Sequence, residues 1–405
     1  MDQAQPALFQ LSLMMVAGER SGDMYGGELA RALTARRPAL ALFGCGGKAM
    51  RDAGVETLVD AHQLSMAGIT EVLAGLPRAW RALRLLVREA ERRRPALAVL
   101  IDFPDFNLRL AKKLGRIGVP VVYFVSPQIW AWRPGRLRQI KERVRMMLCI
   151  FDFEEKLYRE AGVPVEYVGH PLVDRMVPGL TREEFFRSAG LDSGLTTVAL
   201  LPGSRPREVS VHLPIMLDAA SQLASRRLQF VVAIAPSLDP KWVEAFSPEG
   251  GAQGLAPLRS GGAKIAFLHD ATYDALAYSD LSMVASGTAT VEAALAARPM
   301  VVVYRVSPLS WMTGKLVVKV PFYSMVNLLA GKAVVPELMQ SDFTAEKLAG
   351  AVESLLDHPE ERRAMAQELL AVKARLGPGH AIERAAEAVL RLLDNRSSSA
   401  AVTGS

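Results

Sequence analysis

Two aspartates follow a strand-like apolar run in the string "ALAVLIDFPDFNLRLAKK". A carboxylate at the carboxyl end of a strand, partly removed from water beside Phe103 and Phe106, can have a raised pKa and accept a proton near neutral pH. Asp102 is therefore a candidate general base, and Asp105, three residues later, need not point the same way. A helix N-cap and a hydrated turn would also explain these residues, with Asn107 capping the helix that follows.

Two further turns place small and hydroxyl-bearing residues directly after strand-like runs. They are Gly203-Ser204-Arg205 in "VALLPGSRPREV" and Ser286-Gly287-Thr288 in "SMVASGTATVEAAL". Backbone N–H groups at a helix start, with a hydroxyl or a guanidinium, suit an anion such as a diphosphate. Glu292 lies one helical turn beyond Thr288 and could hold a ribose diol. Either turn alone is explained by an N-cap, but two in one half of the chain favour a nucleoside diphosphate.

A fourth turn, "AGERSGD", ends the first strand-like run. It contains no Walker motif and no dinucleotide fingerprint. A tight turn in which Ser21 or Asp23 caps the next helix explains it equally well. Downstream, "SPQIWAWRPGR" combines tryptophans and arginines, for which structural packing is the commoner explanation.

These turns need strands that end at a common edge. Strand-like and helical patterns alternate along the chain, which is typical of parallel α/β sheets with ligands beyond the carboxyl ends of the strands. The pattern breaks near "YVGHPLVDRMVPG" and then restarts. The sequence therefore predicts two Rossmann-like domains facing each other across a central cleft, at residues 1–172 and 173–376. We also expect a helix at 377–393, able to return to the first domain, and a disordered tail at 394–405.

Composition narrows the function classes. The 405 residues include 48 basic and 42 acidic side chains, a net charge of +6, which does not identify a nucleic-acid-binding protein. Cys45 and Cys149 have neither disulfide nor metal-ligand spacing, so we expect a reducing, cytoplasmic compartment. No apolar run is long enough to span a membrane. No Asp-x-Asp motif follows a strand and the histidines have no ligand spacing; we therefore expect no metal and no cofactor.

The chain also resembles a known family over residues 12–393. The strings "AGERSGD", "MAGITEVL", "IDFPDFNLRLAKK", "VVYFVSPQIWAWRPGR", "FEEKLYREAGVPVEYVGHPL", "LLPGSRPREV", "ASGTATVEAALAARPMVVVYRV" and "NLLAGKAVVPELMQ" occur in the order seen in lipid-A-disaccharide synthases. The resemblance implies an inverting glycosyltransferase of the GT-B fold. The implied reaction joins UDP-2,3-diacylglucosamine to 2,3-diacylglucosamine 1-phosphate and releases UDP and a β-1,6-linked disaccharide. Diacylated substrates further imply peripheral contact with the cytoplasmic face of the inner membrane.

The resemblance also assigns roles to residues. Asp102 matches the family's proposed base, Arg205 an essential arginine, and Glu292 a nucleotide-binding glutamate. The predicted UDP-binding set is Ser204, Arg205, Ser286, Gly287, Thr288, Glu292, Asn327 and Gln340. The predicted acceptor-side set is Gly18, Glu19, Ser21, Gly22, Asp105, Trp130 and Arg133, within which Asp105 is expected to be mainly structural.

The string "GLPRAWRALRLLVREAERRRP" predicts the membrane contact. Pro77 suits a helix start, and Leu76, Trp80, Leu83, Val87 and Ala90 recur at helical spacing. Between Leu76 and Pro95, seven arginines and two glutamates give a local charge of 7 − 2 = +5. An ordinary amphipathic helix packed on the sheet is the alternative to an anionic lipid surface bound through residues 65–94.

Other function classes stay open at this point. A sugar-nucleotide epimerase would use the same UDP turns, although the strings around Asp102 and Trp130 do not resemble that family. A nonenzymatic nucleotide-binding protein would keep the turns at Ser204 and Gly287 but would have no use for an acid at Asp102. A nicotinamide oxidoreductase is disfavoured because no dinucleotide fingerprint follows any strand.

Overall fold

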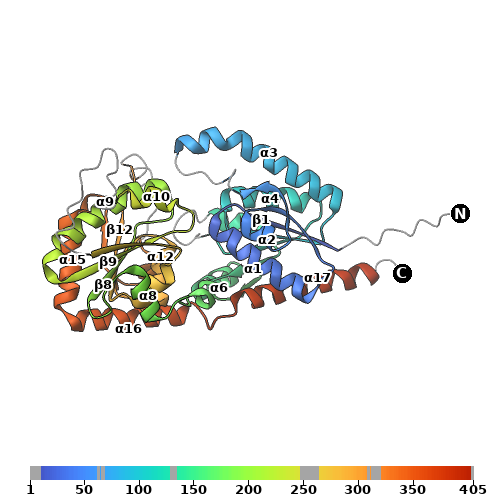
Figure 1. The fold of residues 1–405 in the computed structure, drawn as a ribbon. Helices are drawn as coiled ribbons and strands as arrows, with labels where there is room; N and C mark the ends of the chain where they lie inside the picture. The colour runs from blue at the N-terminus through green and yellow to red at the C-terminus, as the bar shows by residue number, and fades with distance from the viewer. Residues whose placement is uncertain are drawn as a thin grey trace. The chain divides into compact units, whose positions relative to one another are not determined.

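A computed structural model describes residues 11–61, 64, 69–127, 135–246, 264–307, 311 and 321–402. It divides the chain into two compact units (Figure 1). Unit 1 consists of Met1–Pro171 with Leu376–Ser405, and unit 2 of Leu172–Arg375. The predicted α/β architecture with two Rossmann-like parallel sheets is confirmed, and each unit is described by itself below.

Within the described residues, unit 1 has a seven-stranded parallel sheet in the order β3-β2-β1-β4-β5-β6-β7. Its strands are β1 (Ser12–Ala17), β2 (Ala41–Gly46), β3 (Glu56–Asp60), β4 (Leu97–Ile101), β5 (Val121–Phe124), β6 (Met146–Cys149) and β7 (Val165–Tyr167). The chain leaves β1 toward β2 on one side and returns to β4 on the other. The turns after β1 and β4 therefore meet at the switch point, where open α/β sheets bind ligands.

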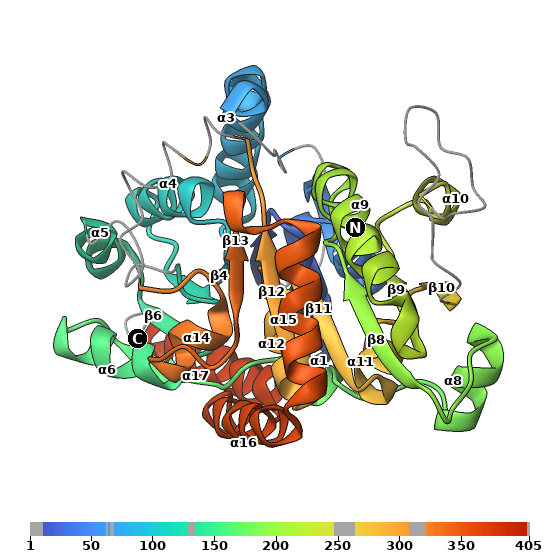
Figure 2. The ribbon, with the colours of Figure 1, turned by 90° about the vertical axis from the view of Figure 1, so that its left-hand side faces the viewer.

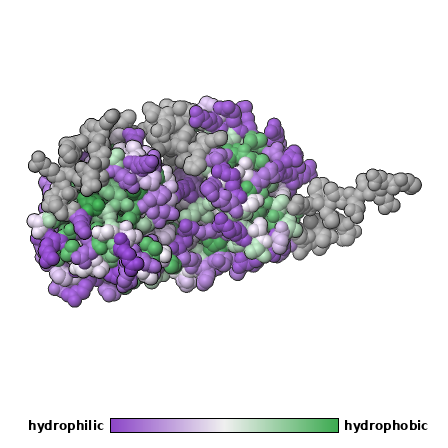
Figure 3. All heavy atoms as spheres, viewed as in Figure 1, coloured by the Kyte–Doolittle hydropathy of each residue, from purple (hydrophilic) through white to green (hydrophobic). Residues whose placement is uncertain are grey.

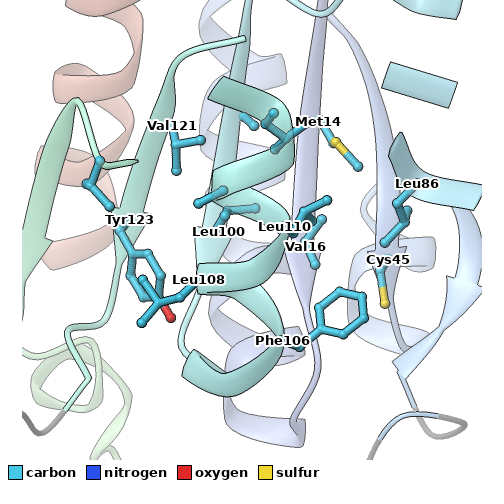
Figure 4. Packing of buried hydrophobic residues seen from close by; sticks show 14 of the residues in the cluster. Met14, Val16, Cys45, Leu86, Leu100, Phe106, Leu108, Leu110, Val121 and Tyr123 are labelled. Atoms are coloured by element: carbon cyan, nitrogen blue, oxygen red, sulfur yellow. The ribbon is translucent and has the colours of Figure 1, made fainter. Parts of the chain in front are cut away.

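The helices of unit 1 are α1 (Arg20–Arg36), α2 (Lys48–Asp52), α3 (Ile69–Arg93), α4 (Pro104–Arg116), α5 (Gly135–Arg143), α6 (Asp152–Glu160) and α17 (Ala381–Val402). Helix α4 buries Leu110, Ala111 and Leu114 at helical spacing against Val16 and Leu100 of the sheet (Figure 4). Each leucine contributes about 1.5–3 kcal/mol on full burial. This packing fixes the start of α4, and with it the turn that contains Asp102.

Within the described residues, unit 2 has a six-stranded parallel sheet in the order β10-β9-β8-β11-β12-β13. Its strands are β8 (Thr196–Leu201), β9 (Leu228–Ile234), β10 (Lys264–His269), β11 (Leu281–Ala285), β12 (Met300–Tyr304) and β13 (Glu337–Met339). Here the order changes direction between β8 and β11. The two predicted anion-binding turns follow these two strands, so the fold brings them to one switch point.

Among the described residues, unit 2 contains the helices α7 (Leu172–Arg175), α8 (Arg182–Ala189), α9 (Pro206–Gln222), α10 (Pro240–Glu244), α11 (Thr272–Tyr278), α12 (Thr288–Leu295), α14 (Met325–Ala330), α15 (Ala345–Asp357) and α16 (Pro359–Arg375). Short 3₁₀ turns lie at Ala224–Arg226 and Gln340–Asp342. Helix α15 contacts β12 and α9 (Figure 2), while α16 contacts α12 and α14.

Two sequence predictions about helix ends are wrong. Helix α3 begins at Ile69 and contains Pro77 in its interior, so this proline removes one backbone donor without ending the helix. Helix α17 packs against α1 and continues to Val402, beyond residue 394, because serine and alanine can extend a helix that packing has already formed. Among the described residues, no helix is long and apolar enough to cross a membrane.

Candidate active site

The turn after β4 presents Asp102 in an uncommon backbone conformation. Asp102 and Phe103 have φ angles of 47° and 50°, and left-handed conformations cost about 1–2 kcal/mol for residues other than glycine. The N–H of Asp102 donates to Phe124 O at 2.9 Å. Its carbonyl oxygen accepts from Tyr123 Oη at 2.6 Å and from Asn107 Nδ2 at 2.8 Å. Side-chain donors therefore stabilise a strained turn at the end of a strand.

The turn after β1 fits against the turn after β4. A Cβ atom on Gly18 would lie 2.1 Å from Cδ1 of Phe103, so the phenyl ring leaves no room for a side chain there. Glu19, the next residue, is the N-cap of α1 and makes no side-chain capping hydrogen bond. Burial, then the charge of Glu19, raise the pKa of Asp102 to about 7, while a hydrogen bond from the backbone of Phe103 opposes the rise. This carboxylate can accept a proton near neutral pH.

Asp105 lies in a different environment from Asp102. Its side chain is 69% exposed and pairs with Nη2 of the buried Arg136 at 2.5 Å. This ion pair joins the first turn of α4 to the first turn of α5. The geometry supports the expected structural role of Asp105.

The structure describes only some of the remaining residues predicted for the acceptor side. Ser21 and Gly22 lie in the first turn of α1, and Gly22 is buried. The alternative interpretation required Ser21 or Asp23 to cap α1, but the N-cap residue is Glu19 and neither side chain caps the helix. Asp23 instead accepts three backbone N–H groups at the start of α2, at 2.6–3.2 Å. Trp130 and Arg133 lie outside the described residues.

In unit 2, the turn after β8 carries Arg205 as the N-cap residue of α9, again without a side-chain capping bond. The Arg205 side chain is 53% exposed, and its Nη1 lies 3.6 Å from Glu208 Oε1. The other carboxylate oxygen of Glu208 accepts from the Ser204 N–H at 3.2 Å. Gly203 has a φ of 124°, and a Cβ on it would lie 2.7 Å from Glu208 Oε2. An internal carboxylate therefore already occupies one donor of the predicted anion site.

His212 connects this turn to the end of β12, a role that the sequence analysis did not foresee. Its Nδ1 lies 2.9 Å from Pro202 O, and its Nε2 lies 3.1 Å from Arg305 N and 3.2 Å from Arg305 O. Burial lowers the pKa of His212. The neutral ring is therefore favoured, and its two nitrogens join the backbone of Pro202 to that of Arg305.

The turn after β11 is open toward solvent. Gly287 has a φ of 148° and nothing lies within 4 Å of the position that its Cβ would take. Gly287 and Thr288 are exposed, and α12 starts without a side-chain cap. Glu292 lies one turn further along the same helix. The arrangement leaves the first N–H groups of α12 without a side-chain acceptor at the N-cap, so an anion could bind them.

A network of hydrogen bonds connects this turn to Glu337. Ser286 Oγ donates to Tyr323 O at 3.0 Å, and the N–H groups of Tyr323 and Ser324 donate to Glu337, each at 2.9 Å. Glu337 Oε1 also accepts from Asn327 Nδ2 at 2.8 Å. The sequence does not predict this role of Glu337, because its three donors belong to the segment Tyr323–Asn327, which precedes it in the chain.

The two polar residues that resemblance placed near the nucleotide are engaged inside unit 2. The Asn327 amide makes four hydrogen bonds, to Val334, Val335 twice and Glu337, at 2.7–2.9 Å. Four is the full capacity of an amide. With its amide oriented to satisfy both groups, Gln340 pairs with the backbone of Val306 at 3.0 and 3.1 Å. Their contact with a nucleotide stays a prediction, and the geometry favours a positioning role for both.

Comparisons with known proteins identify the family. A family model described as lipid-A-disaccharide synthetase matches residues 13–390. The lipid-A-disaccharide synthase of Myxococcus xanthus (strain DK1622) is 47% identical over 383 residues, which cover 94% of this chain and 97% of the relative.

Among solved structures, a UDP-GlcNAc 2-epimerase from Neisseria meningitidis superimposes with a TM-score of 0.58 at 12% identity, covering 94% of this chain and 100% of that one. The calicheamicin glycosyltransferase CalG4 has the same TM-score at 14% identity, covering 95% and 99%. These two similarities show the GT-B fold alone, whereas the family match extends over almost the whole sequence. The chain therefore belongs to the lipid-A-disaccharide synthase family, whose members are hexosyltransferases of lipid A biosynthesis.

Proposed function

We propose that this chain joins UDP-2,3-diacylglucosamine to 2,3-diacylglucosamine 1-phosphate through Asp102 acting as the general base. Membership of the family supports the reaction, which consumes a UDP-sugar donor and a sugar-phosphate acceptor. The observation that carries the role of Asp102 is its place at the end of β4, half-buried beside Glu19, with a pKa raised to about 7.

The base would act on the acceptor hydroxyl. As the 6-hydroxyl oxygen bonds to the anomeric carbon of the donor, its proton passes to the Asp102 carboxylate and the bond from that carbon to the UDP oxygen breaks. A single displacement of this kind inverts the anomeric configuration and gives the β-1,6 linkage. A positioned base raises the reaction rate by a factor of about 10²–10⁴.

The two turns of unit 2 would hold the leaving UDP. Negative charge grows on the diphosphate as the bond breaks, and preorganised donors stabilise such charge best. Arg205 supplies a half-exposed guanidinium, and the uncapped start of α12 supplies backbone N–H groups. Glu292, one turn into α12, would accept hydrogen bonds from the ribose hydroxyls.

Helix α3 would bring the enzyme to its lipid substrates at the cytoplasmic face of the inner membrane. Leu83, Leu86 and Ala90 are buried in the core of unit 1. Leu76 and Trp80, which sequence analysis placed on the same apolar face, are 38% and 47% exposed.

The exposed face of α3 is strongly basic. Hydrophilic side chains lie along much of its described part (Figure 3), and its exposed arginines are Arg78, Arg81, Arg84, Arg88 and Arg92. Exposed apolar side chains beside cations suit an anionic lipid surface. Helix α3 would therefore serve both roles, since Leu83, Leu86 and Ala90 pack in the core of unit 1 while Leu76, Trp80 and the exposed arginines would contact the membrane.

Incubation with both acyl-glucosamine substrates, followed by mass spectrometry of the lipid product, tests the reaction. The expected result is a disaccharide 1-phosphate whose formation equals UDP release. An epimerase would instead change the UDP-sugar in the absence of the acceptor, and that outcome would contradict the proposal.

A further inference from the structure

We propose that Asn107 and Tyr123 are positioning residues that hold Asp102 in its left-handed turn and thereby set the direction and hydration of its carboxylate. The inference rests on the proposed function of Asp102 and goes beyond it. Both side chains act on the backbone beneath Asp102, and both are fully buried.

The backbone hydrogen bonds of the turn show how this works. The carbonyl oxygen of Asp102 accepts from Tyr123 Oη at 2.6 Å and from Asn107 Nδ2 at 2.8 Å, which uses both of its lone pairs. The same Nδ2 atom donates to Ile101 O at 3.2 Å. Asn107 therefore ties the last residue of β4 to the first residue of the turn, and Tyr123 adds a second donor to the latter.

Local sequence preference opposes this turn. Phe103 precedes Pro104, and a residue before proline favours the extended region, yet Phe103 has φ 50° and ψ 56°. Asp102 is also left-handed without being glycine. A turn that its own residues disfavour persists only where tertiary contacts over-determine it. The Asn107 and Tyr123 donors, together with the Phe103 ring over Gly18, are such contacts.

Tyr123 is suited to act as a permanent donor. Its ring is buried in the core cluster of unit 1 that also contains Leu108 (Figure 4). Burial raises its pKa well above the ordinary value, as do the neighbouring Asp102, Tyr158 and Asp105, and only Arg136 acts in the opposite direction. The hydroxyl therefore keeps its proton over the working range of pH and remains a hydrogen-bond donor to the Asp102 carbonyl.

Tyr123→Phe is the mildest test, because it keeps the ring and removes one donor. We expect kcat to fall about tenfold or more, with unchanged affinity for UDP, since the nucleotide turns belong to unit 2. A looser turn hydrates the carboxylate, so the pKa of Asp102 should fall from about 7 toward 3.8. Tyr158→Phe is the matched control, because Tyr158 is equally buried but its hydroxyl bonds to Ser126 Oγ at 2.7 Å. Asn107→Ser supplies a second variant that should shift kcat and this pKa in the same direction.

The pKa of Asp102 is best measured by NMR of selectively ¹³C-labelled aspartate, with Asp102→Asn for assignment. This readout does not depend on turnover, so the two hypotheses can fail separately. A wild-type pKa and kcat in Tyr123→Phe would overturn the positioning role, as would an equal loss in Tyr158→Phe. Full activity of Asp102→Asn would instead overturn the role of Asp102 as the base. The pKa measured by NMR would still test whether Tyr123 and Asn107 hold the turn.

Discussion

The Nδ2 atom of Asn327 lies 2.8 Å from Oε1 of Glu337, and this hydrogen bond joins α14 to β13. Glu337 also accepts the N–H groups of Tyr323 and Ser324, and Tyr323 O accepts from Ser286 in the turn after β11. The network thus connects a buried amide to the turn proposed to bind the diphosphate.

Glu337→Gln should weaken UDP binding although Glu337 reaches the turn only through the segment Tyr323–Ser324. The amide replaces one acceptor oxygen by a donor, so one of the N–H groups of Tyr323 and Ser324 loses its partner, at a cost of about 1–3 kcal/mol. We expect a lower melting temperature and a UDP affinity reduced about tenfold in calorimetric titration. An unchanged UDP affinity at a lowered melting temperature would show that the network stabilises the fold but does not affect nucleotide binding.

Glu208→Gln should have the opposite effect on UDP. The Glu208 carboxylate accepts from the Ser204 N–H and lies 3.6 Å from the Arg205 guanidinium, so a diphosphate has to displace a like charge from its own donors. Removal of that charge should raise UDP affinity several-fold at low salt. Glu208→Asp, which keeps the charge, is the control. A weaker affinity in the glutamine variant would instead make Glu208 a support for Arg205.

Glu19→Gln should shift the pH dependence of turnover. Asp102 must be ionised to accept a proton, so kcat/KM rises with pH through its pKa of about 7 and then levels off. Removal of the Glu19 charge lowers that pKa, and the rising limb moves to lower pH. Glu183→Gln, on the exposed first turn of α8, should leave the profile unchanged. A limb that stays in place in Glu19→Gln would show that burial alone sets the pKa.

Charge removal on α3 should release the protein from lipid. A variant with Arg78, Arg81, Arg84 and Arg88 changed to Ser should sediment less with anionic vesicles than the wild type, by about 1 kcal/mol for each arginine near the surface. High salt should release the wild type as well. The matched control changes Arg138, Lys156, Arg159 and Arg363 to Ser, which removes the same charge from other exposed helices. Equal sedimentation of both variants would contradict a specific role for α3.

The sequence predicts where the candidate groups lie but not how they are held. Parallel strands bring their following turns to one edge, so the positions of Asp102 and of the turns at Ser204 and Gly287 follow from the strand pattern. The left-handed turn does not, because neither Asp102 nor Phe103 is glycine. The sequence offers helix capping as one role for Asn107, whereas its side chain donates to the carbonyls of Ile101 and Asp102.

The carboxylates that support the nucleotide turns were also beyond prediction. Glu337 and Glu208 look like ordinary surface glutamates, and their roles arise from donors that the fold brings to them. Pro77 is predicted to start a helix because of its local preference, but the helix begins eight residues earlier, at Ile69. In each case tertiary contacts outweigh a local preference of about 1–3 kcal/mol.

Asp102→Asn should be more stable than the wild type at high pH, which makes it a clean variant. The pKa of Asp102 is raised from 3.8 to about 7, so the folded protein holds this proton more tightly than the unfolded chain does. The associated stability is present below pH 3.8 and is lost as pH rises to about 7. At pH 8 the asparagine variant avoids the cost of ionising this half-buried carboxyl group, and its melting temperature should equal or exceed that of the wild type.

Turnover of Asp102→Asn and Asp105→Asn at pH 8, with UDP affinity measured on the same samples, tests the central claim most directly. We expect Asp102→Asn to lose at least about 100-fold in kcat while UDP binding is retained, and Asp105→Asn to lose far less. A folded Asp102→Asn protein with nearly wild-type turnover, or a greater loss in Asp105→Asn, would contradict the assignment of Asp102 as the base.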